Sequence, residues 1–160
     1  VQELDWWQNV QLTDEVTLHA VRVRHFSNRS TCDRNRALWT GWLVDAPGGP
    51  IYFAGDTGMG SHFAMARRHF GPMRLALLPI APSRPEWFMQ PIHILPREAV
   101  EAHRILGART SIAMHYGTFR LGDDGEHEPV RRLRAAFEPG DAERFWVVEH
   151  GRGRQVPPLP

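Results

Sequence analysis

The 160-residue sequence has no lysine, a single cysteine and no long apolar run, and each absence narrows what the chain can be. All 19 basic residues are arginine, which we attribute to a GC-rich genome rather than to a function. Cys32 has no partner for an internal disulfide, which favours a reducing, cytoplasmic location. No stretch approaches the roughly 20 apolar residues of a membrane span, and we expect no signal peptide. The formal net charge of +1 gives no electrostatic reason to expect nucleic acid as a partner.

Strand-like and helix-like segments alternate along the chain, which is typical of an α/β fold. Apolar and alternating runs predict strands at 15–23, 37–46, 50–55, 74–80, 110–115 and 144–150. Helical periodicity predicts helices at 61–70, 96–106 and 126–137. Ser61 is the expected N-cap of the first helix, and Gly107 is expected to stop the second. The order places hairpin strands first and β-α-β-α-β after them, so we expect a mixed sheet with helices packed on one face.

Three of the predicted strands end at a polar residue that could serve a site. His25 lies in RHFSNR, Asp56 in IYFAGDTG and His115 in IAMHYGTF. In α/β sheets, functional residues gather in the loops that leave the carboxyl ends of strands. Neutral imidazole and carboxylate groups are the ligands that a catalytic zinc prefers. The three residues are therefore candidate metal ligands.

Each of these residues also has a structural interpretation when it is taken singly. Asp56 lies between Gly55 and Gly58, which would let the backbone bring its carboxylate close to a ligand, but a turn aspartate that caps the next helix fits equally well. His115 could be a core or turn histidine, and His25 an exposed loop histidine.

Longer motifs run through the chain in order, namely DWW, RNRALWTGWLV, IYFAGDTG, FGPMRLALLPIA, EWFMQPIHILPREAV and MHYGTF. Together they resemble the metallo-β-lactamase-fold hydrolases, and among these the branch of N-acyl-phosphatidylethanolamine-hydrolysing phospholipase D and its bacterial relatives. The resemblance extends from ELDWW at 3–7 through GTFRLGDD at 117–124. It implies that residues 1–150 form the C-terminal half of an αββα metallo-β-lactamase sandwich, followed by a flexible tail at 151–160.

Carried over to this sequence, the resemblance implies that His25 binds a first zinc, that Asp56 bridges two zincs as the central catalytic residue, and that His115 binds the second. A shared carboxylate offsets the repulsion between two cations roughly 3.5–4 Å apart, and such cations bring the pKa of water close to neutrality. His93, in QPIHILP, matches a family histidine that faces the substrate. We expect it to bind substrate or to transfer a proton, with a loop histidine of no special role as the alternative.

The HxHxDH motif that supplies the other metal ligands in this family is absent from the sequence. We therefore expect that the N-terminal half of the domain is missing from this chain. We also expect the chain to be inactive on its own.

For the intact protein, the resemblance implies a zinc-dependent phosphodiesterase of phospholipase D type that acts on N-acyl-phosphatidylethanolamine-like lipids. A lactonase or other ester hydrolase on the same two-metal site is the alternative among enzymes, because a fold alone does not select a reaction. A metal-free interaction domain is the alternative outside them. The implied partner is a small-molecule or phospholipid substrate, which allows peripheral membrane contact, and a homo-oligomer is compatible with the sequence.

Two further groups of side chains bear on these interpretations. Trp87, Phe88 and Met89 precede His93 and could either pack in the interior or receive an acyl chain. The arginines at 131, 132 and 134 are expected to form the solvated face of a helix, with a phosphate-binding role as the alternative.

Overall fold

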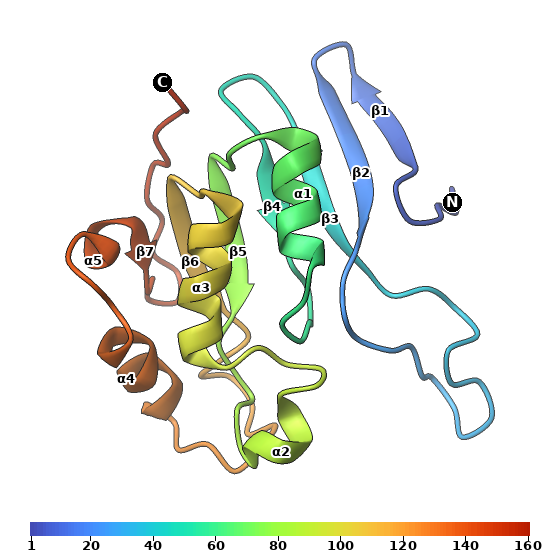
Figure 1. The fold of residues 1–160 in the computed structure, drawn as a ribbon. Helices are drawn as coiled ribbons and strands as arrows, with labels where there is room; N and C mark the ends of the chain where they lie inside the picture. Colours follow the sequence, from blue (N-terminus) through green and yellow to red (C-terminus); the bar gives the residue numbers. More distant parts are fainter.

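The computed structural model describes residues 1–160 and contains one seven-stranded sheet whose strands lie in sequence order (Figure 1). The first four strands pair antiparallel, and the fourth to the seventh pair parallel. The strands are β1 (Asn9–Thr13), β2 (Val16–Arg22), β3 (Thr40–Asp45), β4 (Ile51–Phe53), β5 (Leu75–Pro79), β6 (Thr110–Met114) and β7 (Phe145–Trp146). The sheet is therefore mixed, as the order of predicted elements indicated.

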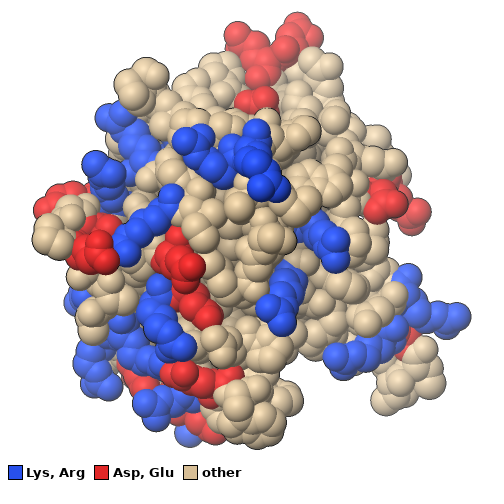
Figure 2. All heavy atoms as spheres, in the orientation of Figure 1, with Lys and Arg blue, Asp and Glu red and all other residues tan.

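The helices connect the parallel strands, and α1 and α3 cross one face of the sheet in Figure 1. They are α1 (His62–Phe70), α2 (Glu86–Met89), α3 (Pro96–Leu106), α4 (Glu128–Ala135) and α5 (Asp141–Arg144). This arrangement confirms the α/β prediction with helices on one face. No helix has both the length and the hydropathy that a membrane crossing requires. On the helix-covered face, acidic and basic side chains are interspersed (Figure 2).

The hydrophobic core lies between the sheet and these helices. Alternate strand residues point to the same side of a sheet, and on the helix side Leu43, Tyr52 and Leu78 are fully buried. On the other side, Trp42 is only partly buried and Phe53 is 40% exposed. The sheet thus has one fully packed face and one apolar face that remains partly open to solvent.

The ends of the two long helices follow the sequence signals with one difference. Ser61 occupies the N-cap position of α1, but its side chain makes no capping hydrogen bond. At α3, the Glu98 carboxylate accepts the Leu95 backbone N–H at 2.8 Å, so the acidic residue of the first turn does the capping. Gly107 ends α3 in the left-handed conformation with φ of 57°, as predicted.

Four elements differ from the sequence prediction. The last strand was expected at 144–150 but covers only Phe145–Trp146, because α5 precedes it directly and only two residues of β6 pair with it. β1 was not predicted, since its alternation is limited to Val10 and Leu12 and its side chains are mostly exposed. α2 and α5 were not predicted either, because a helix of four residues is too short to show a 3.6-residue period.

The end of the chain, expected to be a flexible tail, packs against the hairpin between β3 and β4 and the start of β5. The Arg74 guanidinium donates to the carbonyls of Val156 at 2.8 Å and Pro157 at 3.3 Å, and the Leu159 N–H donates to the Gly48 carbonyl at 2.9 Å. The flexibility of the tail stays a prediction. Because these bonds hold the chain from Val156 onwards, the flexible part would be limited to residues 151–155.

Candidate metal centre

Four strands of the sheet deliver their following loops to one edge. β2, β4, β5 and β6 run in the same direction, and their carboxyl ends meet at the lower edge of the sheet in Figure 1. His25, Asp56 and His115 lie in the loops after β2, β4 and β6, and Ala81 lies in the loop after β5. This topology brings together residues that are far apart in the sequence.

The side chains of His25, Asp56, His93 and His115 form one cluster. His115 Nε2 lies 3.1 Å from Asp56 Oδ1. The ligand-capable atoms of His25, Asp56 and His93 all lie within 4.8 Å of one another. The His93 ring lies between the other two histidines, with centroid distances of 5.3 Å to His25 and 5.6 Å to His115. The predicted site residues therefore converge, whereas their role as metal ligands stays a prediction.

Hydrogen bonds fix the rings of His25 and His115 in the same way. His25 Nδ1 lies 3.0 Å from the Phe26 carbonyl, and His115 Nδ1 lies 2.7 Å from the Ala81 carbonyl. A carbonyl only accepts, so Nδ1 donates a proton in both rings, and Nε2 is the ring atom that remains for a metal ion. Metal-ligating histidines are typically oriented by such a bond at the other ring nitrogen.

The Nε2 atoms of the two rings face the cluster. His25 Nε2 is buried and has no hydrogen-bond partner, and His115 Nε2 points at the Asp56 carboxylate. Two imidazole Nε2 atoms beside a carboxylate are a donor set that suits a divalent transition metal. The residues present thus fit a metal ion.

His93 differs from these two histidines. No carbonyl orients its ring, and its Nδ1 is buried without a hydrogen-bond partner. Burial lowers the pKa of His93 to about 4, with Asp56 acting in the opposite direction and His25 and His115 in the same one. The ring is therefore neutral at pH 7, with one nitrogen that can accept a proton and one that can donate. This state suits either a contact with substrate or a proton transfer.

Backbone conformation aims the site residues at the cluster. His115 has φ of 62°, a left-handed conformation that few non-glycine residues adopt, and this ends β6 and turns the ring towards Asp56. Gly55 also has a positive φ, of 60°, directly before Asp56. At Gly58 an added Cβ would lie 2.4 Å from the Pro91 carbonyl oxygen, so only glycine allows this close contact of the two loops.

Two tryptophans of the DWW and RALWTGW motifs hold the segment before His25. Trp39 Nε1 donates to the Val23 carbonyl at 3.0 Å, and Trp6 Nε1 donates to the Trp39 carbonyl at 2.7 Å. The two indole rings pack edge to face with centroids 5.5 Å apart. These motifs therefore support the strand end that carries His25.

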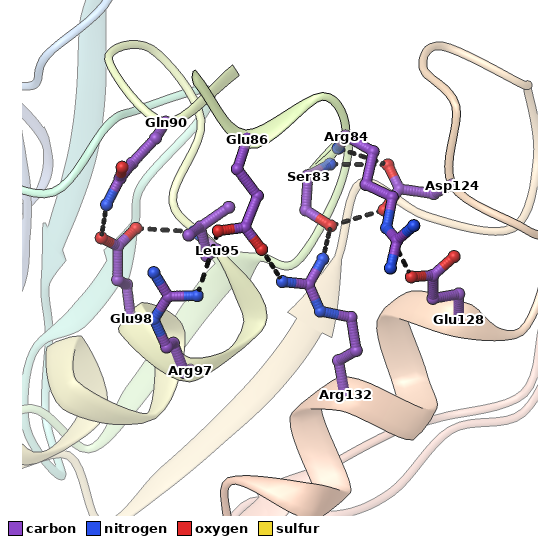
Figure 3. Close-up of polar contacts among 10 residues, drawn as sticks. All are labelled: Ser83, Arg84, Glu86, Gln90, Leu95, Arg97, Glu98, Asp124, Glu128 and Arg132. Atoms are coloured by element: carbon purple, nitrogen blue, oxygen red, sulfur yellow. Dashed lines mark hydrogen bonds and ion pairs between the residues drawn. The ribbon is translucent and has the colours of Figure 1, made fainter. Parts of the chain in front are cut away.

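A polar network fixes the loop between β5 and α2 to the chain around α4 (Figure 3). The Asp124 carboxylate accepts the backbone N–H groups of Ser83 at 2.6 Å and Arg84 at 3.1 Å. Arg132 donates to Ser83 Oγ at 2.8 Å and pairs with Glu86. The prediction that Arg132 lies on a solvated helix face is wrong, because this side chain turns towards the loop instead. The same loop contributes the Ala81 carbonyl that orients His115.

Open space adjoins the cluster at His115. A cavity of about 510 Å³ is lined by His115, Ala81 and the loop at 116–126, and a second of about 690 Å³ shares His115 and contains Met114 and His150. Trp87 is 80% exposed and Phe88 55% exposed, and neither lines these cavities. His115 thus stands where bound molecules could reach the cluster.

Sequence reasoning missed three contributors to this geometry. The carbonyls of Phe26 and Ala81 orient two histidines, but a backbone carbonyl leaves no mark in the sequence. Thr57 is fully buried beside Asp56 and is bonded to neighbouring loops. Its signal was a hydroxyl residue directly after Asp56 in the AGDTG turn.

Comparison with known proteins agrees with this arrangement. The family described as the beta-lactamase superfamily domain matches residues 1–116. An uncharacterized protein of Mycobacterium tuberculosis is 42% identical over 161 residues, which cover 99% of this chain and 41% of that protein. N-acyl-phosphatidylethanolamine-hydrolyzing phospholipase D 1 of Caenorhabditis elegans is 37% identical over 143 residues, which cover 86% of this chain and 40% of that protein. The chain spans about two fifths of the length of these relatives.

Among solved structures, Igni18, described as a novel metallo hydrolase from the archaeon Ignicoccus hospitalis, superposes with a TM-score of 0.68 at 22% identity. The match covers 93% of this chain and 57% of Igni18, and it shows the fold. Sheet order, converging loops and sequence lead to the same conclusion, namely that the chain belongs to the beta-lactamase superfamily and is related to its N-acyl-phosphatidylethanolamine-hydrolysing branch.

Proposed function

We propose that the protein containing this chain is a zinc-dependent phosphodiesterase of phospholipase D type that acts on N-acyl-phosphatidylethanolamine-like lipids. The observation that carries this proposal is the cluster at the carboxyl edge of the sheet, where ring nitrogens of His25 and His115 lie beside the Asp56 carboxylate. The substrate class is supported by the 37% identity to the Caenorhabditis elegans relative whose name states that activity.

In this proposal His25 and Asp56 hold one zinc, and Asp56 and His115 hold the other. When bound, two such cations bring the pKa of water close to neutrality and stabilise negative charge on a phosphoryl oxygen. Asp56 supplies the anion that both cations share. The bonds from Nδ1 of His25 and His115 to backbone carbonyls orient the two rings and leave Nε2 as the atom that would hold an ion.

His93 has a separate role in this proposal. Its ring is buried beside the cluster and neutral at pH 7, and no protein group satisfies its Nδ1 atom. Such a ring can form a hydrogen bond to a phosphoryl oxygen or accept a proton during the reaction. A role as a further metal ligand is the competing assignment, because its ligand atom lies within 4.8 Å of those of His25 and Asp56.

We further propose that a preceding half-domain completes the site. The chain lacks the HxHxDH motif, spans about two fifths of its relatives, and leaves an apolar sheet face with Phe53 40% exposed. A second layer over this face would bury it and add the other ligands. Residues 1–160 expressed alone should therefore bind fewer than two zinc ions, and weakly. Tight binding of two ions by this chain alone would contradict the half-domain proposal.

A lactonase or other ester hydrolase is the second candidate, and one observation favours it. The cavity of about 510 Å³ beside His115 includes Asp123, Asp124 and Glu126, with Arg120 as its one cationic side chain. An acidic lining disfavours an anionic phosphodiester relative to an uncharged ester.

The deciding experiment uses the full-length natural protein. Its metal content is measured by mass spectrometry, and its turnover is compared on N-acyl-phosphatidylethanolamine in mixed micelles, on lactones of increasing chain length and on aryl esters. We expect close to two zinc ions per chain and the highest kcat/KM on the phospholipid, with N-acylethanolamine and phosphatidic acid as products. Two zinc ions with a preference for lactones would favour the ester hydrolase. A folded protein without metal or turnover would favour a metal-free interaction domain.

A further inference from the structure

Thr57 follows the central carboxylate Asp56 and is completely buried, with an exposed fraction of 0%. Its side chain does not enter the cluster of histidines. Instead, its hydroxyl and its carbonyl bond to the segments on either side of it. Through these bonds Thr57 is connected to the loops that carry three of the four cluster residues, namely His25, Asp56 and His93.

The first link joins the loop of Asp56 to the loop of His25. The Arg24 backbone N–H donates to Thr57 Oγ1 at 3.0 Å, and the Gly58 N–H donates back to the Arg24 carbonyl at 2.8 Å. The Arg24 guanidinium also donates to the Met59 carbonyl at 3.0 Å. The residue before His25 is therefore held on both backbone groups by the Thr57–Gly58 segment.

The second link joins the same segment to the loop of His93. The Ile94 N–H donates to the Thr57 carbonyl at 2.7 Å. Gly58 lies against Pro91, where a Cβ would approach the carbonyl oxygen to 2.4 Å. His25 and His93 are thus each one residue away from a backbone N–H bonded to Thr57, and Asp56 directly precedes Thr57 in the chain.

His62, the first residue of α1, completes the surroundings of the hydroxyl. Its Nε2 lies 3.2 Å from Thr57 Oγ1, and the hydroxyl donates its proton to the Gly58 carbonyl at 2.8 Å. Since that proton is used, His62 Nε2 must donate, and the hydroxyl accepts from His62 and from Arg24. All hydrogen-bonding capacity of the hydroxyl is then used, in a buried position where an unmade bond is costly.

From this geometry we propose that Thr57 is a positioning residue that holds the loops of His25, Asp56 and His93 in the arrangement needed to bind metal and substrate. The inference rests on the proposed metal site. It assigns part of the positioning of the metal ligands to a residue that touches neither metal nor substrate. Removing the hydroxyl leaves the Arg24 N–H and the His62 ring unpaired, so the loop of His25 can shift relative to Asp56. A packing role alone would depend on the γ-methyl group of Thr57 and not on its hydroxyl.

The test compares Thr57→Val, which keeps the shape and removes the hydroxyl, with Thr57→Ser, which keeps the hydroxyl and removes the methyl. Both are made in the full-length protein. Zinc affinity is measured by competition with a chromophoric chelator, kcat and KM with the best substrate, and thermal unfolding on the metal-free protein. Groups that orient metal ligands typically change metal affinity by about 10–100-fold, which is the loss we expect for Thr57→Val together with a lower kcat. Thr57→Ser should stay close to the parent.

Ser111→Ala is the matched control, because Ser111 Oγ forms a buried hydrogen bond at 2.7 Å with His103 Nδ1, on the helix side of β6. It should lower the unfolding temperature without changing zinc affinity. If Thr57→Val does not fold, His62→Phe, which removes one bond to the hydroxyl, should weaken zinc binding by a smaller factor.

Three outcomes would overturn the inference while leaving the proposed function intact. One is parent-like zinc affinity and kcat in Thr57→Val, or in His62→Phe where Thr57→Val does not fold. The others are a loss in Thr57→Ser as large as that in Thr57→Val, or an equal loss of zinc affinity in Ser111→Ala. A parent protein that binds no zinc would overturn the proposed function, and this inference with it.

Discussion

His115 Nε2 lies 3.1 Å from Asp56 Oδ1, while Nδ1 of the same ring lies 2.7 Å from the Ala81 carbonyl. One imidazole therefore connects the loops that follow β4, β5 and β6. The left-handed backbone of His115 makes this contact reachable, because an extended residue would continue β6. The relationship explains how a sheet edge built from distant segments can present one compact set of donors.

Replacing Asp56 should have a larger effect than replacing His93. In the full-length protein, Asp56→Asn should lose zinc and activity together, because the shared anion between two cations is gone. His93→Ala should keep its zinc and lose about 10²–10⁴-fold in turnover, the range expected for acid–base assistance. Metal analysis and steady-state kinetics on the same preparations check this. Loss of zinc from the His93 variant would make His93 a ligand, and parent-like kinetics would make it a loop histidine without a role.

His115 has two roles that substitutions can separate. It is a proposed metal ligand, and its left-handed backbone ends β6. Asparagine adopts the left-handed conformation more readily than most residues, whereas a β-branched residue is strained there. His115→Asn should therefore lose about one zinc per chain while the metal-free protein keeps its unfolding temperature. His115→Val should lose the zinc and also unfold at a lower temperature. Equal unfolding temperatures for the two variants would argue against strain at this position.

Tyr52 offers a test of the packed core. The side chain is fully buried against Phe63, its hydroxyl has no hydrogen-bond partner in the protein, and burial raises the pKa of the phenol. Because an unsatisfied buried polar group costs about 1–3 kcal/mol, Tyr52→Phe should leave the free energy of unfolding unchanged or increase it. Tyr52→Ala should lower it by about 3–5 kcal/mol, as for other buried aromatic residues. Urea unfolding measures both, and a marked loss in Tyr52→Phe would reveal a bonded hydroxyl.

His62 should make the stability of the metal-free protein depend on pH. Burial, with help from Arg22 and Arg24, lowers the pKa of His62 to about 4, against 6.5 as its ordinary value. The unfolded chain then binds more protons than the native one between these values. The contribution of His62 to stability is therefore complete above pH 6.5 and is lost as the pH falls towards 4, with a slope of at most about 1.4 kcal/mol per pH unit.

His62→Gln removes this titration and keeps a donor near Thr57. Urea unfolding at pH 7.5, 6.5, 5.5 and 4.5 should show a shallower loss of stability in the variant than in the parent. His103, which is also buried with a lowered pKa, remains in both proteins and keeps the slope above zero. Parallel curves for parent and variant would show that His62 does not titrate in this range.

The sequence predicted that His25, Asp56 and His115 lie at strand ends, because apolar runs mark where the strands end, and the order of hairpin and β-α-β units places such ends at one edge of the sheet. It could not predict the rotation of each ring, which depends on the carbonyls of Phe26 and Ala81 and on a positive φ at a non-glycine residue. These features arise only when loops from different strands pack together.

The fold shows the same difference between features that a sequence pattern predicts and features that depend on tertiary contacts. The long periodic segments, such as α3 and the buried strand β5, were predicted because their burial pattern extends over several residues. The short elements α2 and β7 depend on tertiary contacts, such as the two-residue pairing of β7 with β6. Arg132 was assigned to solvent because a helical wheel does not show the loop that its side chain meets.

The central claim is that His25, Asp56 and His115 hold metal, and anomalous X-ray diffraction at the zinc edge from crystals of the full-length protein tests it most directly. We predict two anomalous peaks about 3.5–4 Å apart, one within about 2.0–2.2 Å of His25 Nε2 and an Asp56 oxygen and the other equally close to His115 Nε2 and Asp56. Crystals grown with zinc that show no peak at these residues, or a peak bound by His93 in place of His115, would contradict it.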